Sequence, residues 1–256
     1  MTIPSALPMP SNADPSESNR LPPNTVFDEF ELIGVLGEGG FSVVYRAYDR
    51  LLGREVAIKE YMPSSIAFRA SDMSVKARTP SVAELYSKGL NDFVGEARTL
   101  ARFDHPSLVK VYRVWRVNGT AYMVMPLYAG DTLKSVLKKS PGLSTAHWVK
   151  RLLGPLLDAL EYVHGKDCLH RDIAPDNILM LESGRPLLLD FGAARHVIGD
   201  VTQALTVILK PGFAPPEQYA ADSSIKQGTW TDVYALGALA WHCATGRAPA
   251  PSINRI

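Results

Sequence analysis

The chain has 256 residues, of which 46% are hydrophobic, enough to build one large domain or two lobes that share a cleft. Its 27 Lys and Arg residues nearly balance 26 Asp and Glu residues, which leaves a net charge of +1. The charge balance therefore argues against nucleic acid or a membrane surface as a partner, and any anionic ligand must be held by local groups. No run approaches the roughly 18 consecutive apolar residues of a transmembrane helix, and the N-terminus has no signal-peptide pattern.

The cysteine usage points to a reducing compartment. Cys168 and Cys243 lie far apart in apolar segments, which suits two buried thiols better than a disulfide. We expect a cytoplasmic location, and a membrane anchor beyond Ile256 would be compatible with this segment.

The first third of the chain changes from tail-like to strand-like composition. Residues 1–26 are rich in Pro, Ser and Asn without an apolar period, which predicts a disordered tail. From Phe27 onward, three β-branched and aromatic runs punctuated by glycine predict an antiparallel meander: ELIGVLGEGG, FSVVYRAYD and EVAIKEY. Residues 62–90 are weakly periodic, so we expect a long insertion with one short helix near Val82 to Leu90.

The middle of the chain continues with one helix and two strands. Residues Asn91 to Phe103 have apolar side chains at helical spacing, with Asn91 or Asp92 as the cap. Strands are predicted at Leu108 to Arg116 and Thr120 to Met125, and Asn118-Gly119 between them is a strong hairpin signal.

The remaining segments are mainly helical. A hinge at 126–131 would separate a strand-rich lobe, 27–125, from a helix-rich lobe, 132–256, and the cleft between them is the natural ligand site. The elements predicted after the hinge are helices at Asp131 to Lys138, Ser144 to His164 (kinked at Gly154-Pro155) and Asp232 to Thr245, and a strand at Pro186 to Leu189.

Chemistry is concentrated in CLHRDIAPDNILML, residues 168–181. Asp172 and Asn177 stand five residues apart with Pro175 between them, so no regular helix carries both and a tight loop must hold them. The apolar runs on either side, Cys168-Leu169 and Ile178 to Leu181, would anchor the loop as short strands. Taken alone, this pattern also fits a polar surface turn.

Two further motifs suggest phosphate binding without proving it. Gly37, Gly39 and Gly40 lie in GEGGFSVV between two strands, where small residues let backbone N–H groups approach a phosphate. A glycine-rich turn without a ligand fits equally well. Lys59 ends the hydrophobic strand VAIK, and a buried lysine needs an anion, although an edge lysine could reach solvent instead.

The order GEGGFSVV, VAIK, an acidic helix, HRDIAPDN, DFG and PPE resembles the eukaryotic-type protein kinase family, from about Phe30 to Arg247. EARTLARFDHPSLVKVYRV and PGFAPPEQY are similar to bacterial serine/threonine kinases in particular. The resemblance implies an α+β, bilobal protein-kinase-like fold. Its N-lobe would hold a five-stranded antiparallel sheet and one helix, and its mainly helical C-lobe would stop after the helix that contains Asp232.

The resemblance also implies roles for individual residues. Lys59 would contact the α and β phosphates of ATP and pair with Glu96, which lies on a better amphipathic helix than Glu84. Asp172 would accept or orient the proton of a substrate hydroxyl, while Asn177 and Asp190 would hold Mg²⁺. The ATP site implied in this way comprises Leu36, Gly37, Glu38, Gly39, Gly40, Phe41, Ser42, Val44, Ala57, Lys59, Met125, Pro126 and Tyr128.

Met125 would guard the back of the adenine pocket, and the Pro126 carbonyl and Tyr128 N–H would bind adenine. Four further side chains would stack as an internal hydrophobic column, which sequence alone does not distinguish from ordinary core: Leu100, Val111, His170 and Phe191.

Two departures from the family pattern stand out. Ser42 replaces a loop glycine, which is a mild change. Ala174 stands where serine/threonine kinases carry a lysine that touches the transferring phosphate, and loss of that cation would raise the barrier. Our hypothesis is that Lys210, in LKPGFAPPE, reaches back toward Asp172 and supplies the missing charge; the alternative is an exposed loop lysine.

Arg171 precedes Asp172, and kinases with this arginine often await a phosphate on the following loop, for which Thr202 and Thr206 are the candidates. Glu217 would normally pair with an arginine beyond the end of this chain.

Three functions remain open at this stage. The leading one is a protein serine/threonine kinase that uses ATP and Mg²⁺, acts on protein Ser/Thr hydroxyls, autophosphorylates and signals in a bacterium. Ala174 keeps a nucleotide-binding pseudokinase scaffold open as an alternative. A small-molecule phosphotransferase is disfavoured by PGFAPPEQY. The sequence gives no indication of the oligomeric state.

Overall fold

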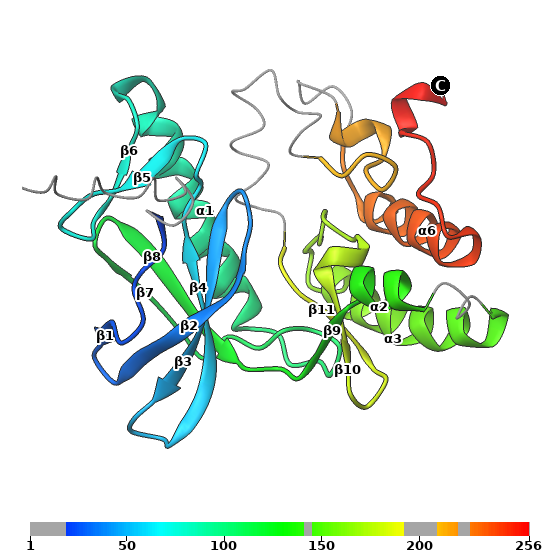
Figure 1. Ribbon diagram of the computed structural model, residues 1–256. Coiled ribbons are helices and arrows are strands. Elements are labelled where there is room, and N and C mark those ends of the chain that lie inside the picture. The colour runs from blue at the N-terminus through cyan, green and yellow to red at the C-terminus, as the bar shows by residue number, and fades with distance from the viewer. Residues whose placement is uncertain (1–18, 141–144, 192–208, 220–225, 256) are drawn as a thin grey trace, which may run out of the picture.

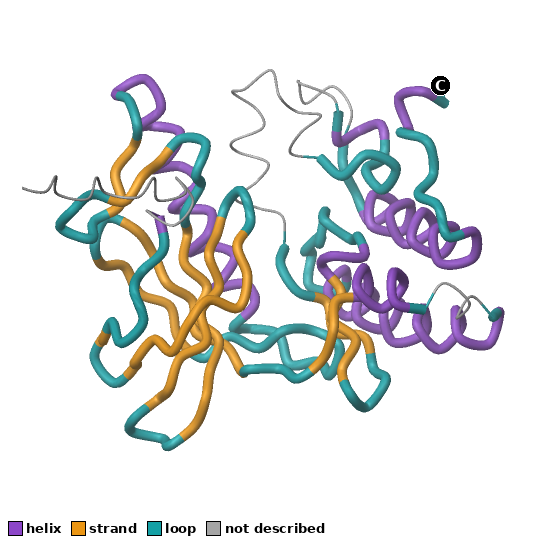
Figure 2. Tube along the Cα trace, viewed as in Figure 1, coloured by secondary structure: helices purple, strands orange, loops and turns teal. Residues whose placement is uncertain are grey.

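A computed structural model describes residues 19–140, 145–191, 209–219 and 226–255, and it shows two lobes. The strand-rich lobe carries one long helix, and the helix-rich lobe carries only a small sheet (Figures 1 and 2). This is the predicted bilobal arrangement. None of the helices in the described ranges is long and apolar enough to cross a membrane.

The strand-rich lobe is built on an antiparallel sheet with strand order β1-β2-β3-β4-β8-β7. A two-residue strand, β1, pairs with the start of β2, so the sheet has six strands where five were predicted. The strands are β1 (Val26–Phe27), β2 (Phe30–Glu38), β3 (Ser42–Asp49), β4 (Arg54–Tyr61), β7 (Arg113–Val117) and β8 (Thr120–Pro126).

The last hairpin of this sheet has the predicted turn but a later start. Asn118 and Gly119 both have positive φ, 53° and 73°, as expected for a tight two-residue hairpin turn. The strand predicted from Leu108 begins instead at Arg113. The residues around Val109 bond to the other lobe instead of to β8, because the N–H of Val109 donates to Leu188 O and the N–H of Leu188 donates to Ser107 O.

The insertion after β4 is more ordered than its weak periodicity predicted. It holds a hairpin, β5 (Ala67–Arg69) with β6 (Val75–Ala77), and leads into one continuous helix, α1 (Ala83–Leu100). The two helices predicted here are therefore one, and the residues predicted to cap the second lie inside it. Its buried residues form a single face that runs from Leu85 to Leu100.

The predicted disordered tail is too long, because residues 19–26 are part of the folded lobe. Leu21 is only 3% exposed, and its N–H donates to the Tyr45 hydroxyl. Arg69 of β5 binds Asn19 through both its backbone N–H and its guanidinium. These contacts depend on the insertion, so composition alone could not reveal them.

The helix-rich lobe contains α2 (Leu133–Lys139), α3 (Ala146–His164) and α6 (Thr229–Thr245), with α3 packed against α6 (Figure 1). Side-chain hydroxyls cap the first two helices, Thr132 for α2 and Thr145 for α3. α2 begins later than predicted because residues 130–132 pair as a strand, and Pro155 does not end α3.

The helix-rich lobe also contains a small three-stranded sheet, whose middle strand directly follows the loop with Asp172 and Asn177. Its strands are β9 (Gly130–Thr132), β10 (Ile178–Leu181) and β11 (Pro186–Leu188), in the order β11-β10-β9. The predicted strand after Asn177 is thus present, whereas Cys168 and Leu169 form no strand. Both cysteines are free thiols, and burial raises the pKa of Cys243 to about 11.

Candidate active site

The loop that carries Asp172 and Asn177 is held by hydrogen bonds at both ends. Asn177 Nδ2 donates to the backbone oxygen of Asp172 at 2.8 Å and to its Oδ2 at 2.5 Å. The loop does bring the two polar side chains together, as the sequence predicted. The donation also leaves Asn177 Oδ1 as the amide atom suited to a cation.

A buried carboxylate on α6 fixes the start of the same loop. Asp232 is fully buried, and it accepts hydrogen bonds from the backbone N–H groups of His170, at 2.9 Å, and Arg171, at 2.7 Å. His164 Nε2 lies 2.8 Å from Asp232 as well. Arg171 has a left-handed backbone with φ of 64°, so these bonds stabilise a conformation that arginine rarely adopts.

Lys59 lies where the strand-rich lobe meets the DFG segment. Its Nζ is 2.6 Å from Asp190 Oδ1 and 3.8 Å from Glu96 Oε1. The Lys59 and Glu96 side chains are both buried, whereas Glu84 is exposed on α1. Lys59 thus lies within ion-pair distance of Glu96, its predicted partner, but the closer carboxylate is that of Asp190, which was predicted to hold Mg²⁺.

Lys210 contacts two carboxylates of the catalytic loop. Its Nζ lies 3.3 Å from Asp172 Oδ1 and 2.8 Å from Asp176 Oδ1. Partial desolvation works against the charged form of the half-exposed Asp176, but Lys210, together with a backbone hydrogen bond and Lys134, holds the pKa of that carboxyl below its usual value. Lys210 therefore has the placement that our sequence hypothesis required.

The glycine-rich turn between β2 and β3 borders the cavity that contains Lys59 and Asp190. The N–H of Gly39 donates to Ser42 O, and the carbonyls of Gly40 and Phe41 accept from Ser64 and Met62 at the start of the insertion. Space is open around the glycines, where an added Cβ would meet nothing within 4 Å. A small cavity of about 20 Å³ beneath the turn is lined by Phe41, Ser42, Lys59, Tyr61, Phe93, Glu96, Asp190 and Phe191.

The other residues predicted to bind ATP lie on neighbouring strands. Val44 is opposite Lys59, and Ala57 is opposite Met125. Pro126 ends β8, and Tyr128 follows it with its hydroxyl accepting from the N–H of Lys110. Leu36, Gly37 and Glu38 form the exposed end of β2, where Glu38 pairs with Arg20.

The predicted hydrophobic column is largely buried. Leu100, His170 and Phe191 are 5% exposed or less, and Val111 is partly buried against the same core. The rings of His170 and Phe191 are in contact in a tilted arrangement, with 35° between their planes and centroids 4.6 Å apart. Complete burial lowers the pKa of His170, so its imidazole stays neutral near pH 7.

The oxygen atoms at this site fit Mg²⁺ better than they fit a transition metal. Asn177 and Asp190 would provide an amide and a carboxylate oxygen, and Mg²⁺ is commonly held by one or two carboxylates together with phosphate oxygens. Within the described ranges no cluster of three or more His, Cys, Asp or Glu side chains could hold a metal. An ion here would thus depend on the phosphates of a nucleotide.

The motif order and this geometry agree with the comparisons to known proteins. The family model described as "Protein kinase domain" matches residues 30–255. The chain belongs to the protein kinase domain family. A solved structure titled "PpkA-294 apo form" is 48% identical, with a TM-score of 0.86, and the match covers 93% of this chain and 83% of that one.

Several curated relatives of the kinase domain come from bacteria. The DNA damage-responsive serine/threonine-protein kinase RqkA of Deinococcus radiodurans is 32% identical over 244 residues, which cover 90% of this chain and 32% of RqkA. Serine/threonine-protein kinase PknA of Mycobacterium tuberculosis is also 32% identical, with 88% of this chain and 48% of PknA covered. The chain thus spans about a third to a half of the length of these relatives.

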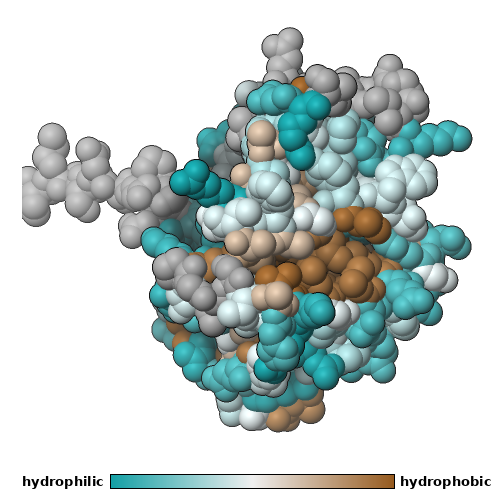
Figure 3. Space-filling view, turned by 90° about the vertical axis from the view of Figure 1, so that its right-hand side faces the viewer, coloured by the Kyte–Doolittle hydropathy of each residue, from teal (hydrophilic) through white to brown (hydrophobic). Residues whose placement is uncertain are grey.

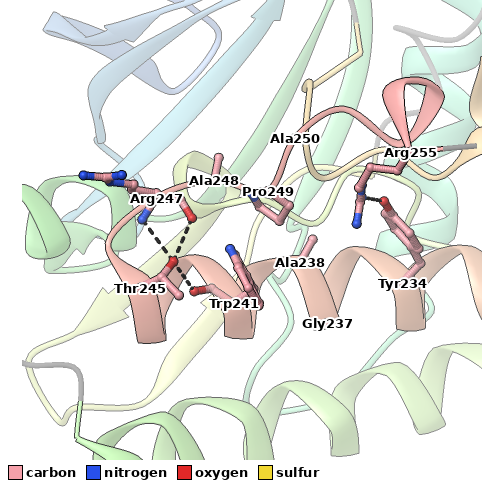
Figure 4. A pocket seen from close by; sticks show the side chains of 10 residues that line it. All are labelled: Tyr234, Gly237, Ala238, Trp241, Thr245, Arg247, Ala248, Pro249, Ala250 and Arg255. Atoms are coloured by element: carbon pink, nitrogen blue, oxygen red, sulfur yellow. Dashed lines mark hydrogen bonds between the residues drawn. The ribbon is translucent and has the colours of Figure 1, made fainter.

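A second cavity of the kinase domain, about 980 Å³, lies along α6 and away from these motifs. Figure 4 shows it between α6 and the segment that follows this helix. Its lining is Tyr234, Gly237, Ala238, Trp241, Thr245, Arg247, Ala248, Pro249, Ala250 and Arg255. Hydrophobic side chains also gather on the face of the molecule shown in Figure 3, and α3 and α6 carry the exposed Leu157, Trp230, Val233 and Trp241.

Sequence reasoning missed two residues that organise the kinase domain's site, Asp232 and Asp176. A carboxylate inside the apolar run of α6 was a usable signal, because a buried charge needs partners. Asp176 gave no such signal, since its contact with Lys210 joins segments 34 residues apart. Glu217, for which an arginine partner was expected, accepts a hydrogen bond from Thr231 Oγ1. Thr202 and Thr206 lie outside the described residues.

Proposed function

We propose that this chain is the catalytic domain of a protein serine/threonine kinase, which transfers the γ-phosphoryl group of ATP to Ser or Thr hydroxyls of proteins. The observation that carries the proposal is the meeting of the two lobes, where Lys59 binds Asp190 while Asn177 binds Asp172. The names of the bacterial relatives, all serine/threonine-protein kinases, support the same activity.

Each polar residue has a distinct task in this proposal. Asp172 takes the proton of the acceptor hydroxyl as the new oxygen–phosphorus bond forms and the bond to the leaving ADP breaks. Lys59 binds phosphate oxygens of ATP, and Glu96 orients the Lys59 ammonium. Asn177 and Asp190 would hold Mg²⁺, which neutralises phosphate charge when it is bound.

We also propose where ATP binds and where the protein works. The base would lie against Ala57 and Met125, with the backbone of Pro126 and Tyr128 at its edge and the glycine-rich turn over the phosphates. The lobes would be 19–125 and 132–255, joined by the hinge, and the domain would act in the cytoplasm of a bacterium. The partners would be protein substrates, without nucleic acid.

A pseudokinase scaffold remains the main alternative, but no observation favours it. Lys59, Glu96, Asp172, Asn177 and Asp190 are all present; Lys59 lies within ion-pair distance of Glu96 and Asp190, and Asn177 donates to Asp172.

The test compares the wild-type chain with Asp172→Asn, both incubated with Mg²⁺, radiolabelled ATP and an acceptor protein. We expect transfer by the wild type, and a loss of at least about 100-fold in the variant with ATP affinity unchanged. Binding of ATP by both proteins without any transfer would instead establish the scaffold. Lys139→Met, which removes an exposed ion pair with Asp131, is the control.

A further inference from the structure

Lys210 is a cation in contact with Asp172, the carboxylate assigned to proton transfer. Its ammonium lies 3.3 Å from Asp172 Oδ1, and its side chain is only 19% exposed. It comes from the segment before the PPE motif, far along the chain from the loop it contacts. A lysine in this position is held close to the reacting groups rather than free in solvent.

Hydrogen bonds to neighbouring residues fix the backbone around Lys210. The carbonyl of Lys210 accepts from the N–H groups of Phe213 and Ala214, which closes a turn. Gly212 in that turn has φ of 90°, and a Cβ there would lie 2.5 Å from the carbonyl oxygen of Pro249. Ser252 Oγ donates to Ala214 O from the same neighbouring segment.

Asp176 then holds the Lys210 side chain on the catalytic loop. The 2.8 Å contact is shorter than the one to Asp172, and the Asp176 side chain is 45% exposed. An ion pair with so exposed a partner contributes little to stability. The pair between Lys210 and Asp176 would therefore add little to the stability of the fold, whereas a fixed positive charge beside a developing negative charge has a large effect on reaction rate.

The neighbouring position in the loop contains no charge. Ala174 lies between Asp172 and Asp176 and is only 1% exposed. Lys59, the other lysine at the site, is within ion-pair distance of Asp190 and Glu96. Among the residues that the structure describes, Lys210 is thus the lysine placed within ion-pair distance of Asp172.

We propose that Lys210 is a catalytic residue that neutralises charge on the transferring phosphoryl group beside Asp172, and that Asp176 positions it. The inference rests on the proposed kinase activity. As the acceptor oxygen binds phosphorus and its proton passes to Asp172, the bond to ADP breaks and negative charge builds on the phosphoryl oxygens. The Lys210 ammonium faces that charge while hydrogen-bonded to Asp176.

The experiment moves the charge within the loop. It compares wild type, Lys210→Gln, Lys210→Arg and the double variant Ala174→Lys/Lys210→Gln, with Lys139→Met as the matched surface control. We expect kcat for phosphate transfer to fall by about 100-fold or more in Lys210→Gln, with Mg-ATP affinity and melting temperature close to those of the control. Lys210→Arg should keep more activity, and the double variant should regain at least about tenfold.

Two results would overturn the inference while leaving the proposed function intact. One is a Lys210→Gln variant within about threefold of an active wild type. The other is a loss of kcat, Mg-ATP affinity and melting temperature together that neither Lys210→Arg nor the double variant restores, which would make Lys210 structural. A wild type that binds Mg-ATP but transfers nothing would overturn the proposed function itself.

Discussion

Glu60, the residue after Lys59 in β4, forms a buried ion pair with Arg69 of β5. This pair should be among the largest single contributions to stability in the strand-rich lobe. Arg69 Nη2 lies 2.6 Å from Glu60 Oε2, and the two side chains are 2% and 0% exposed. Tyr45 and Tyr122 donate their hydroxyls to the same carboxylate, each at 2.8 Å. Arg69→Met would leave Glu60 buried without its cation.

The magnitude follows from that burial. Removing one partner of a buried pair costs about 3–5 kcal/mol, because the remaining charge has lost its counter-ion. Arg69 also donates to the carbonyls of Asn19 and Met73, so the variant should loosen the residue 19–21 segment and the insertion together. A loss of this size is a large part of the roughly 5–15 kcal/mol that stabilises a typical domain.

The assay is urea unfolding followed by tryptophan fluorescence. Arg46→Met is the control, because its bidentate pair with Glu55 is exposed (47% and 38%) and its loss should change the free energy of unfolding by about 1 kcal/mol or less. Adding Glu60→Gln to Arg69→Met should recover part of the loss. If Arg69→Met destabilises no more than Arg46→Met does, the reasoning about this pair is refuted.

Three other variants test separate parts of the structure. Burial lowers the pKa of His170 in the folded chain, so the unfolded chain binds the proton at a higher pH than the folded chain does. The free energy of unfolding should therefore fall by up to about 1.4 kcal/mol per pH unit below pH ~6.5. His170→Phe should flatten that slope in pH-dependent unfolding. Gly119→Ala should lower the free energy of unfolding in urea by at least about 1 kcal/mol, since φ is 73° and the new Cβ would clash with the Val75 carbonyl. Its control is Gly95→Ala, inside α1 with open space, which should not be destabilising. Lys59→Met should reduce phosphate transfer about 100-fold or more in a radiolabel assay, and activity near that of the wild type would remove Lys59 from the proposed site.

The parts of the fold that were predictable carry their information locally. The Asn118-Gly119 turn and β10 appear where the residue pattern places them, because turn chemistry and apolar runs act over a few residues. The ordered position of residues 19–26 was not predictable, because it depends on contacts between Arg69 and Asn19. A Pro- and Ser-rich segment cannot show by composition that another part of the chain will bind it.

The site shows the same division. Motif order was enough to propose Lys59, Asp172, Asn177 and Asp190 as site residues, since each belongs to a short pattern with a known place in the family, and the structure pairs Lys59 with Asp190 and Asn177 with Asp172. The single α1 helix was missed because polar Asn91 and Asp92 resemble a helix start, although apolar residues on both sides share one face. The contact between Lys210 and Asp172 could be conjectured only because Ala174 left a charge unaccounted for.

Phosphoamino-acid analysis after incubation with Mg²⁺ and ATP tests the central claim most directly. The wild-type chain and Asp172→Asn are each incubated with a mixture of acceptor proteins, and the phosphorylated residues are identified after hydrolysis. We expect phosphoserine and phosphothreonine with the wild type and neither with Asp172→Asn. Phosphotyrosine as the main product, or equal labelling by the two proteins, would contradict it.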